Sequence, residues 1–267
     1  MNREQWRPTR RTELDYLADI WRILTGYSKR ERVSLLSASE FIEKYALQAA
    51  TRMITALYFH GARTWREAAI EASQGRIIAR ALANEMRGPV GVTVRNLIAE
   101  NSELIKTLPQ DIALQVSKHA AKQAQQGGRP EELARVLTAH LTRVSARRLA
   151  RTEISKANTA LIEARAENLD LPAYVWETSQ DQRVRLSHRK MQGVLIFWND
   201  PPSPERLVGE KSEGNYQAGG IWNCRCFPAT VVRLEHLSWP MRVYRQGAIR
   251  MMTLGQVRRL YERQAAA

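Results

Sequence analysis

Residues 174–202 read YVWETSQDQRVRLSHRKMQGVLIFWNDPP, and residues 219–228 read GGIWNCRCFP. The runs at 174–176 and 194–197 are short, aromatic and β-branched, and they lie between turn residues, which is typical of strands in a small sheet. Both cysteines of the chain and one of its five histidines lie in this stretch. We therefore expect any site with definable chemistry to be found here.

Before this stretch, the apolar residues have helical spacing. The spacing, two capping-box patterns at 37–40 and 64–67, and breaks at glycine predict three helices, over residues 12–26, 37–61 and 64–88. The helical pattern then continues to Pro109, which suits the first turn of a further helix. After Gly127 and Gly128, Pro130 begins another helix, and residues 150–169 are again helical.

After residue 226 the pattern predicts strands near 227–232 and 241–244, followed by a short basic helix capped by Thr253 and Gln256. The fold class is therefore α+β and mostly α. It consists of an N-terminal multi-helix bundle, a small β-containing domain and a C-terminal helix. We expect a basic arm at residues 1–11, a helical domain at 12–150 and a motif domain with a basic tail at 151–267.

The chain is strongly basic, with 41 Lys and Arg residues against 27 Asp and Glu, and a net charge of +14. The excess lies before residue 150 and after residue 228, whereas the stretch between is close to neutral. Two interpretations are open: a polyanionic partner such as nucleic acid, or arginines that decorate solvated helix faces. No apolar run approaches the roughly 20 residues that span a membrane, so we expect a soluble protein made in a cytoplasm.

Cys224 and Cys226 are separated by one residue, a spacing that strains a disulfide but allows both sulfurs to reach one metal ion. With His188 they form a partial zinc site, for which Asp181 and Asp200 are the nearest further ligands by sequence. The alternative is two small buried thiols beside a hydrogen-bonded core histidine. Both interpretations stay open at this point.

Asp181, Arg183 and Arg185 alternate along a short extended or turn segment, which directs both arginines to one side. This group could bind phosphate, or it could be an ion-paired clasp that joins two parts of the sheet, and we favour the clasp. No spacing here requires a catalytic nucleophile with its base. A metal-dependent nuclease that uses His188 with the cysteines or Asp181 remains the enzymatic alternative.

These motifs resemble the signature of the phage Mu F-like minor head proteins, the phage head morphogenesis family. The resemblance covers roughly residues 90–230, including the helical segments ENSELIKTLP and ARRLARTEISKANTALIEARA. The matching positions are Thr178, Asp181, Arg183, Val184, Arg185, His188, Gly193, Asn223, Cys224, Arg225 and Cys226.

The resemblance implies a minor structural protein of a tailed phage or prophage rather than an enzyme. Such a protein docks on the portal during procapsid assembly, with capsid or scaffold protein and double-stranded DNA as further partners. It would lie in the virion head at the portal vertex and in the host cytoplasm during assembly. Some relatives have extra cysteines in the first half of the motif, where this chain has Arg185 and His188, so the resemblance leaves open whether zinc is bound.

Overall fold

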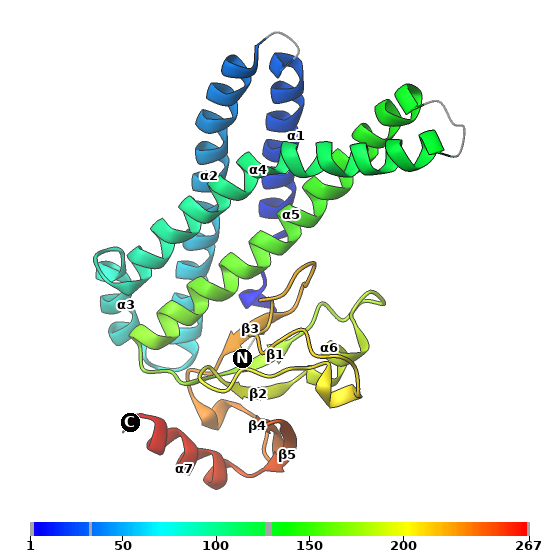
Figure 1. Ribbon diagram of the computed structural model, residues 1–267. Coiled ribbons are helices and arrows are strands. Elements are labelled where there is room, and N and C mark those ends of the chain that lie inside the picture. Colours follow the sequence, from blue (N-terminus) through cyan, green and yellow to red (C-terminus); the bar gives the residue numbers. More distant parts are fainter. Residues whose placement is uncertain (1–2, 32–33, 126–129, 266–267) are drawn as a thin grey trace. The chain divides into compact units, whose positions relative to one another are not determined.

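The computed structural model in Figure 1 describes residues 3–31, 34–125 and 130–265. For residues 31, 35, 117–125, 130–140 and 263–265 it describes the backbone alone. Long helices form the first part of the chain: α1 (Arg10–Glu31), α2 (Leu35–Glu71), α3 (Gly75–Asn84), α4 (Pro89–Gln125) and α5 (Pro130–Asn168). The remainder contains β1 (Ala173–Glu177), α6 (Leu186–Met191), β2 (Val194–Phe197), β3 (Phe227–Thr230), β4 (Met241–Arg245), β5 (Ala248–Met252) and α7 (Leu254–Ala265). The predicted fold class, α+β and mostly α, is confirmed.

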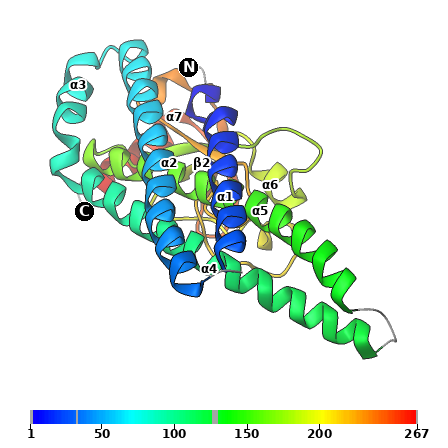
Figure 2. The ribbon, with the colours of Figure 1, turned by 90° about the horizontal axis from the view of Figure 1, so that it is seen from above.

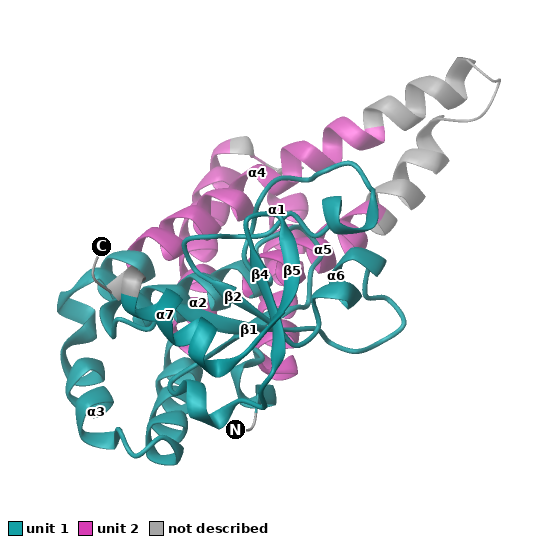
Figure 3. Cartoon of the chain, turned by 90° about the horizontal axis from the view of Figure 1, so that it is seen from below, with its two compact units in different colours: residues 1–8, 57–94, 155–267 teal, residues 9–56, 95–154 magenta. Residues whose placement is uncertain are grey.

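The chain forms two compact units, which are coloured separately in Figure 3. Unit 1 contains residues 1–8, 57–94 and 155–267, and unit 2 contains residues 9–56 and 95–154. Helices α2, α4 and α5 each contribute residues to both units. The continuous domains expected from the sequence stay a prediction, and the site described below belongs to unit 1.

Unit 2 is a helix bundle in which α1 and α2 lie side by side (Figures 1 and 2). Its apolar positions recur at helical spacing, and they pack in the centre of the bundle because this removes their surface from water. A buried polar contact lies among them, where the Tyr16 hydroxyl donates to Asn101 Oδ1 at 3.2 Å. The buried apolar residues include Ile20, Ile23, Ala46, Met53, Leu97 and Ile105.

Unit 1 contains a five-stranded sheet with the order β3-β1-β2-β4-β5. The pairs β1–β2, β1–β3 and β4–β5 are antiparallel, and β2–β4 is parallel. Strand β1 is central to the motif because it pairs with both β2 and β3. Its pairing with β3 sets Glu177 opposite Phe227, which brings the two ends of the motif together.

Both faces of the central strands are buried, because side chains alternate across a strand and each face has its own core. On one face, Tyr174 and Trp176 pack in a cluster that includes Trp65 and Ile162. On the other, residues including Val175 and Phe197 pack with Val257 of α7. The uninterrupted apolar runs of β1 and β2 in the sequence reflect this double burial.

The predicted helix break at residues 61–64 is wrong, because α2 continues to Glu71. A Cβ atom at Gly61 would lie 2.3 Å from Arg165 Nη1, so this glycine allows close packing inside a helix rather than ending one. The chain turns instead at Ser73, which has a φ of +58°.

Three other predicted breaks differ from the structure in the same way. Helix α1 runs through Gly26, where a Cβ would lie 2.4 Å from Phe41 Cζ, and α4 runs through Pro109. Helix α5 is continuous across residue 150. At Gly26 packing has overridden local propensity. Gly127 and Gly128 lie outside the described residues.

The N-terminal segment, predicted as a basic arm, contains a packed element. Residues Arg3–Trp6 form a short 3-10 helix, η1, and Trp6 is buried against Trp65 with a ring-centroid distance of 4.9 Å. Asn158 Nδ2 donates to the carbonyl oxygen of Trp6 at 3.2 Å, and Arg3 forms an ion pair with Glu177 at 2.8 Å. The tryptophan anchors the segment because burying its indole ring outweighs the entropic cost of ordering a few residues.

Candidate metal centre and its ion-pair clasp

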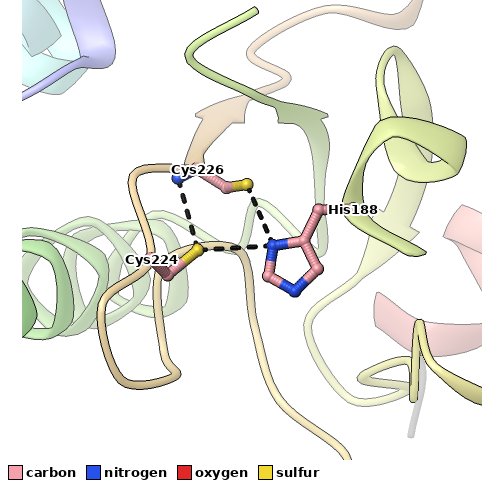
Figure 4. A group of neighbouring side chains, drawn as sticks. All are labelled: His188, Cys224 and Cys226. Atoms are coloured by element: carbon pink, nitrogen blue, oxygen red, sulfur yellow. Dashed lines mark hydrogen bonds between the residues drawn. The ribbon is translucent and has the colours of Figure 1, made fainter. Parts of the chain in front are cut away.

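Three potential metal ligands converge beside strand β1 (Figure 4). His188 lies on α6, in the connection from β1 to β2, and the cysteines lie in the segment that leads into β3. Because β3 pairs with β1, Cys224 and Cys226 are brought next to the connection that carries His188. All three residues are almost fully buried, with exposed fractions of 2–3%.

The distances in this cluster match a tetrahedral zinc site. His188 Nδ1 lies 3.5 Å from Cys224 Sγ and 3.4 Å from Cys226 Sγ, and the three donor atoms all lie within 4.8 Å of one another. A zinc ion with Zn–N of about 2.0 Å and Zn–S of about 2.3 Å holds tetrahedral nitrogen and sulfur ligands about 3.5 Å apart. Two thiolates and an imidazole are also the ligand types that zinc prefers.

The histidine ring is oriented by two residues that sequence reasoning missed. Tyr216 donates its hydroxyl hydrogen to Glu205 Oε1, and its oxygen lies 3.0 Å from His188 Nε2. Since the tyrosine hydrogen is already used, Nε2–H of His188 is the donor in that contact, and the lone pair of Nδ1 faces the two sulfurs. A hydrogen-bond chain behind the imidazole fixes the tautomer that a metal-binding histidine needs.

Burial and the neighbouring carboxylate raise the pKa of Tyr216 above its ordinary value, which keeps its hydroxyl protonated. The pKa of Cys224 is well below that of an ordinary thiol, because Cys226 and His188 hydrogen-bond to it and outweigh the effect of burial. The pKa of Cys226 is raised by its hydrogen bond with Cys224 and by burial. The thiolate is the form in which cysteine binds metals, so a lowered pKa at Cys224 suits a metal ligand.

A cavity of about 60 Å³ adjoins the cluster and is lined in part by Ser179, Arg183 and Arg185. It has room for a water molecule or a small ligand at a fourth coordination position, but not for a nucleotide. Among the described residues, the candidate ligand group contains only the histidine and the two cysteines. The carboxylates of Asp181 and Asp200, considered from the sequence, have other partners.

Asp181 and Arg225 form a bidentate ion pair. The two guanidinium nitrogens lie 2.5 and 2.8 Å from the two carboxylate oxygens, and the backbone N–H of Arg183 donates to Asp181 Oδ1 at 2.9 Å. This fork geometry is the stronger form of carboxylate pairing. It links the segment after β1 to the segment before β3, and we call this pair the clasp.

Arg185 and Trp222 form a second contact between the same two segments. The guanidinium lies 4.2 Å from the centroid of the indole ring, and Nη2 donates to the carbonyl oxygen of Trp222 at 3.1 Å. Asn223 follows with a φ of +53°, a left-handed conformation that asparagine tolerates. This turn carries the chain from Trp222 into Cys224.

Two further motif residues position the strands. Gly193 has a φ of +71°, and its N–H donates to the carbonyl oxygen of Trp176 at 2.8 Å. The backbone N–H and the hydroxyl of Thr178 both donate to Gln192 Oε1, at 2.8 and 2.7 Å. Gln192 was not identified from the sequence, because a single glutamine before a turn glycine has no distinguishing pattern.

We expect Arg225→Gln to raise the pKa of Asp181. In the folded protein burial raises this pKa, but the N–H of Arg183 and the guanidinium of Arg225 outweigh it, so the pKa is below its ordinary value. The ion pair therefore stabilises the fold above the unfolded pKa of about 3.9, and this contribution is lost as the pH falls through the folded pKa.

Carbon-13 NMR titration of the Asp181 carboxyl group would measure this change. Arg183→Gln is the matched control, because the bond from Arg183 to Asp181 uses the backbone N–H and survives the substitution. An Asp181 pKa that is the same in wild type and Arg225→Gln would contradict the clasp.

The fold and this site together define a helical protein with a small sheet-containing unit, in which a buried histidine lies beside two buried cysteines. Residues 114–229 match the family described as Phage Mu protein F like protein. The match confirms the resemblance to the Mu F-like family seen in the sequence, and it covers less than half of the chain.

An uncharacterized protein of Haemophilus influenzae (strain ATCC 51907 / DSM 11121 / KW20 / Rd) is 29% identical over 141 residues, which are 52% of this chain and 29% of that protein. This chain therefore matches less than a third of the relative's length. No solved structure matches the chain.

Proposed function

We propose that this chain is a minor structural protein of a tailed phage or prophage, acting in head morphogenesis. The observation that carries the proposal is the match of residues 114–229 to the Mu F-like family. The geometry of the motif supports it, because Asp181 bonds to Arg225 and Arg185 bonds to Trp222. Residues that pair in this way act on the fold of their own unit.

The small cavity at the metal centre agrees better with a structural role than with an enzymatic role. The cavity beside His188 and the cysteines has a volume of about 60 Å³, whereas sites for drug-sized ligands have about 300–1,000 Å³. A nuclease needs room for a phosphodiester and an attacking water next to its metal. The metal-dependent nuclease is therefore the weaker candidate.

We propose that the centre holds zinc in a structural role, with Cys224, Cys226 and the Nδ1 atom of His188 as ligands. The bound ion would join α6 to the segment before β3, in addition to the clasp. Tyr216 and Glu205 would hold the imidazole in the ligating orientation. A water or an added ligand in the adjoining cavity would complete the coordination.

The proposed partners are the portal protein, then capsid or scaffold protein, with packaged double-stranded DNA nearby. The chain would lie at the portal vertex of the virion head, after assembly in the host cytoplasm. The charge of +14 suits a neighbour that carries many phosphates. None of the helices in the described part of the chain has the length and apolar character to cross a membrane.

Sedimentation with portal rings from the same phage genome tests this proposal. We expect the chain to move with the rings through a sucrose gradient under assembly conditions, and to stay near the top of the gradient without them. Adding double-stranded DNA at low and at high salt tests the DNA partner, because phosphate contacts weaken as salt rises. A chain that stays at the top in the presence of intact rings would contradict portal docking.

A further inference from the structure

A long groove follows α1 and α2 within unit 2. It consists of two cavities, of about 700 and 350 Å³, which share four lining residues. All the residues that line the two cavities lie between Thr12 and Ala56. The groove is therefore formed by α1 and α2 alone. We call it the α1–α2 groove. The four shared residues are Ala18, Asp19, Arg22 and Arg52.

The groove is elongated and lies between antiparallel helices. Its lining on α1 extends from Thr12 to Arg30, which at 1.5 Å per residue is a length of about 27 Å. Contacts from Asp19 to Arg52 and from Arg30 to Phe41 mark the antiparallel pairing along it. A groove of this length between two helices suits a third helix of about 18 residues.

The rim of the groove is basic along its larger cavity. Arg22, Lys29, Arg30 and Arg52 line the larger cavity, whose acidic residue is Asp19. That carboxylate lies 3.3 Å from Arg22 and 2.9 Å from Arg52, so its charge is already compensated. The charge that remains available to a partner is positive, and it is greatest toward Lys29 and Arg30.

The same cavity has an aromatic lining that includes Trp21, Phe41 and Tyr45. Phe41 is half-buried against Gly26, and the guanidinium of Arg30 lies 4.0 Å from its ring centroid. Trp21 is 38% exposed. Aromatic side chains can hold an apolar anchor, and the cations beside them can pair with acidic residues around that anchor.

We propose that the α1–α2 groove binds an acidic amphipathic helix of another protein, with its apolar side chains on the aromatic lining and its carboxylates on the basic rim. A DNA duplex is wide and convex, so it would contact the rim and leave the aromatic lining unused. The proposal goes beyond head morphogenesis by naming a surface and the chemistry of its partner. It is independent of the family match, because the groove lies outside residues 114–229.

Fluorescence anisotropy with a labelled 18-residue peptide tests the proposal. The peptide has leucine at helical spacing and glutamate between, and a scrambled peptide of equal composition and an 18-nucleotide thymidine strand are measured beside it at physiological salt. We expect saturable binding of the first peptide alone. Lys29→Glu with Arg30→Glu should weaken this binding about tenfold or more, and the corresponding glutamine pair should have an intermediate effect.

Arg147→Glu with Arg148→Glu is the matched control, since it makes the same charge change on exposed residues of unit 2 that do not line the groove. It should leave the affinity within about twofold. Phe41→Ala tests the aromatic lining, and circular dichroism melting shows whether each variant is folded.

Stronger binding of the thymidine strand than of the peptide would overturn the proposal in favour of nucleic acid. If the Lys29→Glu/Arg30→Glu and Arg147→Glu/Arg148→Glu variants weaken peptide binding equally, the binding reflects net charge and the proposal is overturned. Absence of saturable binding, together with no enrichment of acidic sequences from a displayed random 18-residue library, would also overturn it. The binding assay contains only this chain and the probes. Its outcome can therefore be interpreted even if the chain does not bind portal rings.

Discussion

Replacing Glu85 with alanine should lower the free energy of unfolding by about 3–5 kcal/mol, because it leaves the buried guanidinium of Arg165 without its counter-ion. The two side chains are each 1% exposed, and Arg165 Nε and Nη2 donate to the two carboxylate oxygens at 2.8 Å. Nη2 also lies 3.0 Å from the carbonyl oxygen of Tyr58, and Nη1 packs against Gly61. The guanidinium has little room to reach water once the carboxylate is gone.

Urea unfolding followed by circular dichroism would measure the loss. Combining Glu85→Ala with Arg165→Met removes both charges, so the double variant should be more stable than the single one. Glu43→Ala is the control for an exposed ion pair, with Lys106 as its partner, and should cost only about 0–1 kcal/mol. A loss below about 1 kcal/mol for Glu85→Ala would show that water reaches Arg165.

If the centre holds zinc as proposed, replacing both cysteines with serine should remove the ion and lower the melting temperature by about 8–16 °C. The range follows from about 4 kcal/mol of ligand stabilisation when free zinc is 1,000-fold above its dissociation constant, at about 2–4 °C for each kcal/mol. Serine hydroxyls are poor zinc ligands compared with thiolates. Metal analysis after purification with zinc, followed by thermal unfolding, gives both quantities.

Three comparisons make the result specific to zinc. A chelator should lower the melting temperature of the wild type by a similar amount and leave the Cys224→Ser/Cys226→Ser variant unchanged. Asp181→Asn should retain about one zinc per chain, because the Asp181 carboxylate pairs with Arg225 and does not belong to the group of candidate metal ligands. A wild-type protein that carries no zinc, and whose melting temperature a chelator does not change, would favour the alternative of buried thiols beside a core histidine.

The sheet could be predicted from the sequence more fully than the helix lengths. Runs such as 194–197 contain only β-branched, aliphatic and aromatic residues between turn signals, so local pattern and tertiary structure agree. The helix ends were predicted too early because Gly26, Gly61 and Pro109 break helices by propensity. Two of them, Gly26 and Gly61, are explained by contacts with distant side chains, Phe41 and Arg165, which no local window contains.

The candidate site could be predicted only in part. Asp181, His188, Cys224 and Arg225 belong to unusual residue clusters, and the structure brings them into two adjoining groups. Tyr216 could not be found in this way, nor could its partner Glu205, because they lie in a polar segment without periodicity. Their role depends on the path of that segment, which returns to α6 through packing rather than through any local motif.

Because the two units are interleaved in the sequence, they become complete at different times during translation. Every residue of unit 2 has been synthesised once the chain reaches Ile154, whereas unit 1 still lacks its strands and its last helix at that point. Residues 57–94 can pack early with Trp6, but they must wait until the chain has passed residue 154 for their core partners in α5 and the sheet. Because domains tend to fold as their residues become available, unit 2 is expected to be the first to fold during translation, and the pairing of β1 with β3, which assembles the candidate zinc site, to come late.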